Sequence, residues 1–180
     1  DMNPGVDEEY FNHVSAMYGI KTDNTLWMWG VNEQAQLGQN DKNHRSSPAQ
    51  IPGTWSKISG GNSNAAAIKT DGTLWAWGSG SQRIFGDNNP RSSPFQIPGT
   101  TWRDILCSKD QLLSIKTDGT LWSWGGNDNG QLGQNNVTAY SSPTQIPGMW
   151  TALTVGEKGS GGIKERGQLW TWGKNNFGTL

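Results

Sequence analysis

The strongest constraint on the fold is a phrase of eleven residues that the chain repeats four times. The phrase reads IKTDNTLWMWG at residues 20–30, and its later copies occupy residues 68–78, 115–125 and 163–173. Counted between the second tryptophans of the phrase, successive copies lie 48, 47 and 48 residues apart. Self-similarity at a fixed period of this size is typical of one supersecondary unit stacked on copies of itself. The sequence therefore predicts a repeat array.

All eleven tryptophans follow this period. Four pairs close the phrase, and each of three lone tryptophans lies 13 residues before the isoleucine that opens the next phrase. A tryptophan buries about 150–250 Å², and none departs from the period, so a core role is favoured over a ligand-binding one. The side chains expected in the core are Trp29, Trp77, Trp124, Trp172, Trp55, Trp102 and Trp150. Among them, Trp77, Trp124 and Trp172 are expected to be buried at equivalent positions of successive units.

Each repeat contains the signals of four short β-strands. Residues 65–70 and 73–78 flank Asp71 and Gly72, a dipeptide that accepts positive φ and closes two-residue hairpins. The lone-tryptophan segment, as in residues 54–60, predicts a third strand. The segment SSPxQIPG predicts a fourth, whose prolines mark a sheet edge because proline cannot donate a ladder hydrogen bond. The expected fold is all-β: a β-propeller of four-stranded blades, here a partial ring of three to four blades.

The period also sets the expected boundaries. A non-repeat segment, residues 1–6, precedes repeats at about 7–54, 55–101, 102–149 and 150–180. The last repeat stops before the glycine that corresponds to Gly38, Gly86 and Gly133. We therefore expect the remaining blades to come from a longer chain or from a second copy. Because an open ring exposes apolar faces and unpaired strands at both ends, residues 1–180 alone are not expected to form a stable soluble monomer.

Composition excludes several classes of protein. A net charge of −1 with 16% charged residues argues against a basic nucleic-acid groove, so no nucleic-acid partner is expected. The lysines that recur after the phrase's isoleucine, as at Lys21 and Lys69, suit solvated strand ends. No apolar run approaches the roughly 18 residues of a membrane-spanning helix. Cys107 is the single cysteine, which rules out an intrachain disulfide and leaves the compartment undecided.

Residues that could carry chemistry are sparse. His13 and His44 lie at non-equivalent places of the repeat, and with one cysteine they form neither a zinc set nor a catalytic triad. The glycine-rich residues 157–162 lack the Gly-Lys-Ser/Thr end of a P-loop. Residues 127–130 lack the acidic ligands of a calcium loop. We predict no catalytic, metal-ligating or cofactor-binding residue and expect the chain not to be an enzyme.

The stretch DGTLWSWGGNDNGQLG, Asp118 to Gly133, resembles the repeat of the regulator-of-chromosome-condensation family. The resemblance covers residues 20–180 and implies blades of a seven-bladed propeller. The sequence of the repeat is most similar to that of bacterial and bacteriophage members, which favours an extracellular or virion-surface location. Repeat two departs from the pattern, with Gly80 in place of asparagine and Phe85 in place of leucine. The nucleotide-exchange activity of the family depends on one propeller surface, and no residue of such a surface can be recognised here.

Function is expected where the repeats differ, since the repeated positions serve the scaffold. The variable positions gather in loops and in the stretches 60–64, 108–112 and 156–161. The loops contain residue types that are enriched at interface hot spots: Arg45, Arg83, Phe85, Arg91 and Tyr140. The alternative is that these loops vary because nothing constrains them.

These observations favour a non-enzymatic propeller scaffold that binds a protein or a surface ligand such as a glycan, as part of a larger virion or cell-surface protein. Two alternatives stay open. One is a guanine-nucleotide exchange regulator of a small GTPase, which has only the family resemblance behind it. The other is a carbohydrate-binding, lectin-like propeller, which requires a solvent-exposed tryptophan.

Overall fold

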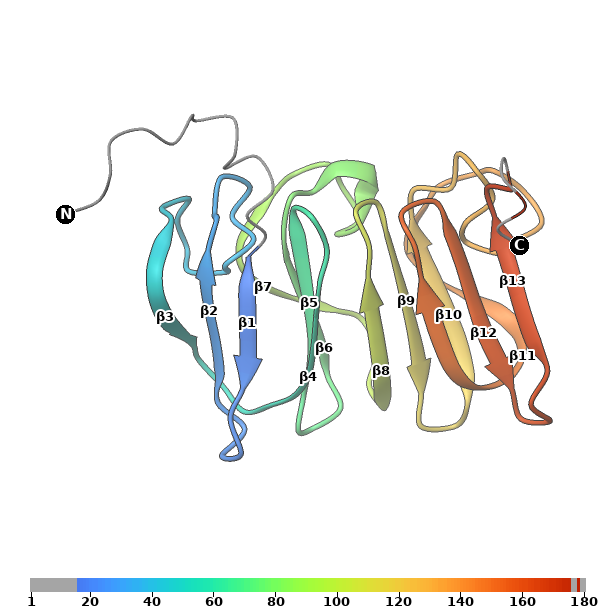
Figure 1. Cartoon of the computed structure of the whole chain (residues 1–180), viewed down its shortest axis with the longest axis horizontal. Helices are drawn as coiled ribbons and strands as arrows, with labels where there is room; N and C mark the ends of the chain where they lie inside the picture. Colours follow the sequence, from blue (N-terminus) through green and yellow to red (C-terminus); the bar gives the residue numbers. More distant parts are fainter. Residues whose placement is uncertain (1–15, 176–177, 179–180) are drawn as a thin grey trace.

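A computed structural model describes residues 16–175 and residue 178, in which antiparallel β-strands stand side by side in a curved row (Figure 1). The segment 1–6 and His13 lie outside the described residues. Within the described part, no helix has the length and apolar character needed to cross a bilayer. The expected all-β propeller architecture is confirmed.

The strands form four consecutive blades. The first consists of β1 (Met17–Ile20), β2 (Leu26–Gly30) and β3 (Arg45–Ile51); the second of β4 (Trp55–Gly60), β5 (Asn64–Lys69), β6 (Leu74–Gly78) and β7 (Arg91–Ile97). The third consists of β8 (Trp102–Cys107), β9 (Gln111–Lys116), β10 (Thr120–Gly125) and the first half of β11 (Tyr140–Val155). The fourth contains the second half of β11, β12 (Gly159–Lys164) and β13 (Leu169–Gly173).

The long strand β11 joins blades three and four. It pairs with β10 from Tyr140 to Met149 and with β12 from Trp150 to Val155, so the two blades share one six-stranded sheet. Between β6 and β7 lies η2 (Ser81–Arg83), a single turn of 3-10 helix. The proline-bearing strands β3 and β7 lie at the edges of their sheets, as the missing N–H donors of proline predict.

A turn forms at the Asp-Gly step, but it is a three-residue loop, 70–72, closed by the Lys69 N–H to Thr73 O bond at 2.9 Å, and not the expected two-residue hairpin. Gly72 has a φ of +79°, and Asp71 Oδ1 accepts hydrogen bonds from the Thr73 N–H at 2.9 Å and from the Thr73 hydroxyl at 2.6 Å. The hydroxyl and N–H of Thr73 hold the pKa of Asp71 below its usual range. The Trp75 indole N–H in turn donates to Thr73 Oγ1 at 2.9 Å. The threonine thus links the turn to the tryptophan, and the same bonds recur in repeats one and three.

The second tryptophan of each pair fills the space between blades. Trp77 donates its indole N–H to the Gln36 carbonyl of the preceding blade at 2.9 Å, and Trp124 donates to the Ile84 carbonyl at 3.1 Å. Both side chains are fully buried. Gly38, with a φ of +65°, faces the Trp77 ring so closely that a Cβ there would lie 2.9 Å from it. Gly133 approaches Trp172 in the same way, so the loop glycines of repeats one and three make room for the tryptophan of the next repeat, whereas Gly86 has no tryptophan atom within 4 Å.

Two of the seven expected core tryptophans are only half-buried. Trp55, Trp102 and Trp150 are buried, but Trp29 and Trp172 are not fully covered. For Trp29, the described residues include no preceding blade whose loop could cover it. Trp172 does donate to the Gln131 carbonyl of blade three at 2.8 Å, but no outer strand lies beside β13 in the described part of the chain.

The lysine that recurs in each repeat also packs against a tryptophan. Each ammonium lies over the indole of the first tryptophan of its pair, at 4.0–4.6 Å from the ring centroid. Such cation–π contacts are worth about 0.5–1 kcal/mol at exposed sites, and the lysine stem covers apolar ring surface that would otherwise face water. The four pairs are Lys21 with Trp27, Lys69 with Trp75, Lys116 with Trp122, and Lys164 with Trp170.

Candidate interaction surface

One face of the blade row carries the long loops and the inner hairpins, along the upper edge of Figure 1. Each inner hairpin is tied by a backbone hydrogen bond to the start of the neighbouring loop, as in Ser79 N–H to Ser63 O at 2.8 Å. We call this side the loop face. Its hairpins are residues 61–63, 108–110 and 156–158, and its loops are residues 31–44, 79–90 and 126–139. The opposite side, which carries the Asp-Gly turns, is the turn face.

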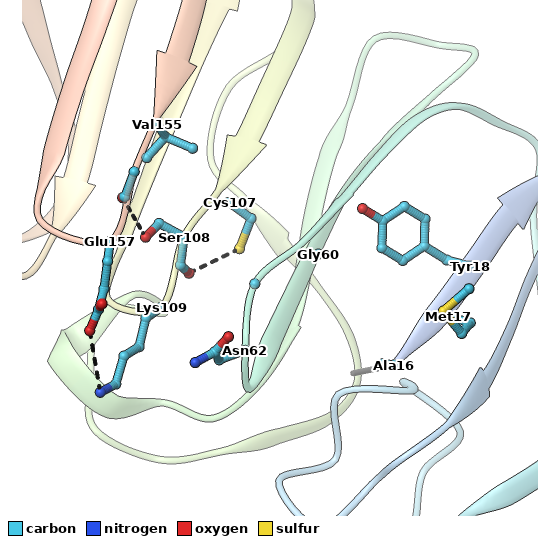
Figure 2. A pocket seen from close by; sticks show the side chains of 12 residues that line it. Ala16, Met17, Tyr18, Gly60, Asn62, Cys107, Ser108, Lys109, Val155 and Glu157 are labelled. Carbon is cyan, nitrogen blue, oxygen red and sulfur yellow. Dashed lines mark hydrogen bonds and ion pairs between the residues drawn. The ribbon is translucent and has the colours of Figure 1, made fainter. Parts of the chain in front are cut away.

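A pocket of about 600 Å³ opens where the inner strands reach the loop face (Figure 2). Three equivalent tripeptides line it, residues 60–62, 107–109 and 155–157, one from each of blades two to four. Residues 16–18 of blade one complete the lining. We call it the inner-wall pocket. These tripeptides fall in or beside the variable stretches that the sequence singled out, and the fold brings them together.

The repeats diverge at the pocket, as they also do at the buried positions 65–67, 112–114 and 160–162. The three tripeptides read Gly-Gly-Asn, Cys-Ser-Lys and Val-Gly-Glu, although they hold the same place in each repeat. In the same blades, the lone tryptophan and the isoleucine that follows it by 13 residues are identical in all three repeats. The three blades therefore keep this tryptophan and isoleucine while the groups that they present to the pocket differ.

Hydrogen bonds between blades hold the pocket wall in place. The Cys107 N–H donates to Ser59 Oγ at 2.9 Å. The Ser108 hydroxyl donates to the Gly156 carbonyl at 2.8 Å (Figure 2). The Asn64 amide donates to the Lys109 carbonyl at 3.1 Å. At Gly61 a Cβ would lie 2.3 Å from the Ser108 carbonyl oxygen, so the backbones approach too closely for a side chain. These contacts fix the inner strands of blades two to four against one another at the pocket.

The charged side chains of the pocket are Lys109 and Glu157. Their ammonium and carboxylate lie 4.0 Å apart, and each side chain is more than half exposed (Figure 2). An exposed pair of this kind contributes little to stability because water and salt screen it. Both charges are therefore available to a ligand at small cost to the fold.

Cys107 lies in the wall but does not supply a nucleophile. Burial raises the pKa of its thiol to about 12, and the thiol donates to the Asn64 side-chain oxygen at 2.7 Å. A neutral, hydrogen-bonded thiol is unreactive because the thiolate is the nucleophile. Among residues 16–175 and 178, His, Cys, Asp and Glu side chains form no group of three that could hold a metal ion.

A second charged cluster joins the blades farther along the inner strands. Asp104 forms ion pairs with Lys57 of blade two and with its neighbour Arg103. Arg103 also donates to the Thr151 carbonyl of blade four at 3.1 Å. Partial burial by itself would raise the pKa of Asp104, but the hydrogen bonds and charges of Lys57 and Arg103 outweigh it and lower the pKa. Three blades are thereby linked through one carboxylate and one guanidinium.

Three of the five contact residues expected from the sequence close their own loops. Arg45 and Arg91 hold the same repeat position and pair with the aspartate four residues earlier, Asp41 at 2.5 Å and Asp87 at 2.9 Å. Tyr140 holds that position in repeat three, and its hydroxyl accepts a hydrogen bond from Asn136 at 3.1 Å. Because each of these side chains already has a partner in its own loop, it is less available to contact a ligand.

The other two expected contact residues, Phe85 and Arg83, differ in their exposure to solvent. Phe85 is buried because it occupies the slot of Leu37 and Leu132, so its ring is not available to a partner. Arg83 is exposed at a φ of +60°, in the left-handed conformation that Ala35 adopts in repeat one. Sequence reasoning missed Lys109 and Glu157 as a pair, although both lie in stretches marked as variable.

Comparison with protein-family models identifies the repeat. Residues 23–68 and 118–160 match the regulator of chromosome condensation (RCC1) repeat, and residues 55–84 match a second model of the same repeat. Together the matches cover more than half of the chain. Comparison with curated protein sequences found no match.

Solved structures share the fold. Human WBSCR16 superposes with a TM-score of 0.83 at 20% identity, covering 92% of this chain and 47% of its own. Prp20p of Saccharomyces cerevisiae gives 0.77 at 19% identity, covering 88% and 43%. The CRINKLY ectodomain of the Arabidopsis thaliana receptor kinase ACR4 gives 0.57 at 11% identity, covering 91% and 52%. The chain thus spans about half the length of these proteins. The repeat matches and the blade architecture agree, and the chain belongs to the regulator of chromosome condensation (RCC1) repeat family.

Proposed function

We propose that the chain is a non-enzymatic β-propeller scaffold that binds a protein partner at the inner-wall pocket. One observation carries the proposal: equivalent tripeptides of three blades meet at one pocket and present different groups there. Blade two contributes two glycines and Asn62, blade three contributes the ammonium of Lys109, and blade four contributes the carboxylate of Glu157. A single ligand that spans the three blades would therefore meet a different group on each.

The chemistry of the pocket suits a polypeptide. Its rim offers one ammonium and one carboxylate 4.0 Å apart, from Lys109 and Glu157, and its wall offers backbone at Gly60, Gly61 and Gly156. A partner loop with an acidic and a basic side chain would match this pair. Prp20p, which shares the fold, is described together with its binding to Gsp1p and histones, and in another structure it is bound by Kap60. Protein partners are thus known for a propeller of this fold.

Two alternatives remain as second candidates. Nucleotide exchange on a small GTPase is supported by family membership, and a nucleotide-release assay with small GTPases would test it. A lectin-like role is supported by the exposure of Trp170, which is 49% exposed. Its counterparts Trp27, Trp75 and Trp122 are all partly covered, so the exposure follows from the open edge of β13. A glycan array would decide whether that ring binds sugar.

Site-specific cross-linking tests the proposal. A photo-cross-linking amino acid replaces Asn62 at the rim of the pocket or Arg166 on the turn face, and the protein is irradiated in an extract of its source. We expect a discrete protein adduct from position 62 and none from position 166. Lys109→Glu and Glu157→Lys should each abolish that adduct, because each creates two like charges at the rim. Adducts of equal yield from both faces, or adducts insensitive to both charge reversals, would contradict the proposal.

A further inference from the structure

A histidine joins the two ends of the blade-one loop, residues 31–44. The Nδ1 atom of His44 accepts a hydrogen bond from the backbone N–H of Asn32 at 3.0 Å. A ring nitrogen accepts a hydrogen bond only while it carries no proton, so this contact requires the neutral imidazole with its proton on Nε2. Histidine is the side chain that changes its charge between about pH 5 and about pH 8. The bond is therefore present when His44 is neutral and lost when it is protonated.

The donor, Asn32, organises the loop. It is fully buried, and its side-chain oxygen accepts a hydrogen bond from the Leu37 N–H at 2.8 Å. Its side-chain amide donates to the Asp41 carbonyl at 3.0 Å and to the Asp41 carboxylate at 3.1 Å. A buried backbone N–H that loses its acceptor destabilises the fold. Loss of the His44 acceptor therefore acts on the residue that holds both ends of the loop together.

A carboxylate lies on the other side of the imidazole ring. His44 Nε2 and the Glu33 carboxylate oxygen are 4.0 Å apart, and both side chains are more than half exposed. The Asn32 N–H requires the neutral ring, whereas the Glu33 carboxylate favours the charged ring. An exposed ion pair contributes little to stability because water screens it. The bond to the buried Asn32 N–H therefore outweighs the ion pair, and protonation of His44 weakens the loop.

The second carboxylate of the loop keeps its charge while a histidine titrates. Asp41 accepts hydrogen bonds from the Arg45 guanidinium and from the Asn43 N–H. These bonds, the one from Arg45 foremost, hold the pKa of Asp41 below its usual range. The Asp41 contacts to Asn32 are therefore the same at both ends of the histidine range.

Blade two contacts the loop through groups that do not titrate near neutral pH. The Trp77 indole N–H donates to the Gln36 carbonyl at 2.9 Å, and the Asn40 N–H donates to the Ser92 carbonyl at 2.7 Å. Trp77 and Leu37 of the loop are buried in the same core cluster. A weakened loop therefore weakens the contact between blades one and two.

The other repeats have no side-chain acceptor at this position. Pro90 and Ala139 take the place of His44 in repeats two and three. Repeat three keeps the central asparagine: Asn127 Oδ1 accepts from the Leu132 N–H at 2.9 Å. Repeat three thus provides a loop of the same design without the histidine.

We propose that His44 is a pH-sensitive latch of the loop 31–44. The neutral ring closes the loop on Asn32. On protonation an Nδ1–H faces the Asn32 N–H, the ring turns toward Glu33, and the loop loosens where blade one meets blade two. The stabilisation by the latch is present at the upper end of the histidine range and is lost as the pH falls. These residues are not part of the lining of the inner-wall pocket, so the latch does not depend on the proposed binding function.

Hydrogen exchange of single amides, followed by NMR on the full chain, tests the proposal. Between about pH 8 and about pH 5, the Asn32 amide should lose at least about tenfold in protection relative to its intrinsic exchange rate, as expected for the loss of one hydrogen bond. The Asn127 amide should keep its protection in the same sample. Unchanged protection of Asn32, or an equal loss at both amides, would overturn the proposal.

Two variants of His44 identify the proton that is responsible. His44→Asn keeps an acceptor that does not titrate, because the asparagine oxygen is bonded to Cγ as Nδ1 is in histidine. It should hold the protection of the Asn32 amide constant over the same range, and His44→Ala should give low protection at both ends. The side chain is more than half exposed, so neither change removes core packing. Both variants retain His13, the other histidine of the chain. A loss of protection on acidification that persists in either variant would overturn the proposal.

Discussion

Replacing Trp124 with alanine should lower the free energy of unfolding by about 3–5 kcal/mol, the range for deleting a large buried aromatic side chain. Trp124 is fully buried, donates its indole N–H to the Ile84 carbonyl at 3.1 Å, and packs against Trp102 with ring centroids 6.1 Å apart. The alanine variant loses the contact between blades two and three and leaves a buried carbonyl without its donor. Denaturant unfolding of the full chain measures the change.

Trp170→Ala is the matched control. It removes the same number of atoms from a tryptophan that is 49% exposed and lies under Lys164. We expect a loss of about 1 kcal/mol or less, in line with surface substitutions outside the core. If the two variants unfold at the same denaturant concentration, Trp124 does not hold the blades together as described.

Gly125→Ala is the second substitution with a large expected effect, a loss of about 3 kcal/mol or more. Gly125 ends β10 with a φ of +106°, and a Cβ there would lie 2.4 Å from the Asp110 carbonyl oxygen. The alanine variant combines an unfavourable backbone conformation with a clash against a backbone atom that cannot rotate away. Gly78 makes the same approach to Ser63 in blade two.

Gly130→Ala supplies the comparison for backbone conformation alone. Gly130 also has a positive φ, +74°, but a Cβ there meets nothing closer than 4.0 Å. Its counterparts in the other repeats are Ala35 and Arg83, with φ of +63° and +60°. We expect a cost of about 1 kcal/mol or less. Thermal unfolding of both variants measures the difference. A Gly125→Ala variant as stable as Gly130→Ala would contradict the close approach of Gly125 to the Asp110 carbonyl.

The scaffold could be predicted from the sequence because its contacts recur in every repeat. The turn at Asp71 and Gly72, the edge position of β3 and β7, and the propeller fold all follow from patterns within one repeat. The third proline-bearing segment does not end a sheet, because it continues as β11 into blade four. The half-burial of Trp29 and Trp172 could not be predicted in the same way. Equal positions in the sequence imply equal environments only where both neighbouring elements are present, and each of these rings lacks one neighbour in the described chain.

The loop residues were harder to interpret. Arg45, Arg91 and Tyr140 belong to interface-prone residue types, yet each bonds to a residue four positions earlier in its own loop. That geometry depends on the loop backbone, which has no periodic pattern. Lys109 and Glu157 could not be paired from the sequence, since 48 positions separate them. They meet because one repeat period brings equivalent residues of adjacent blades side by side.

Within the repeat, the tryptophan and glycine that pack between blades are separate from the positions that line the inner-wall pocket. The tryptophan and glycine that meet between blades, such as Trp77 and Gly38, are the same residue types in successive repeats. Positions at the end of the inner strands face the pocket, and the wall uses the backbone carbonyls of Lys109 and Gly156 as acceptors, which any residue at these positions would supply. Specificity can therefore change without loss of the fold.

Hydrogen–deuterium exchange of the chain, free and bound to the partner recovered by cross-linking at position 62, tests the central claim most directly. A bound partner protects the backbone amides that it covers or whose opening it suppresses. We predict protection concentrated in residues 60–62, 107–109 and 155–157, with the turn-face residues 70–73 and 117–119 unchanged. Protection confined to the turn face, or to the outer loops 31–44 and 126–139, would contradict the assignment of the inner-wall pocket as the binding surface.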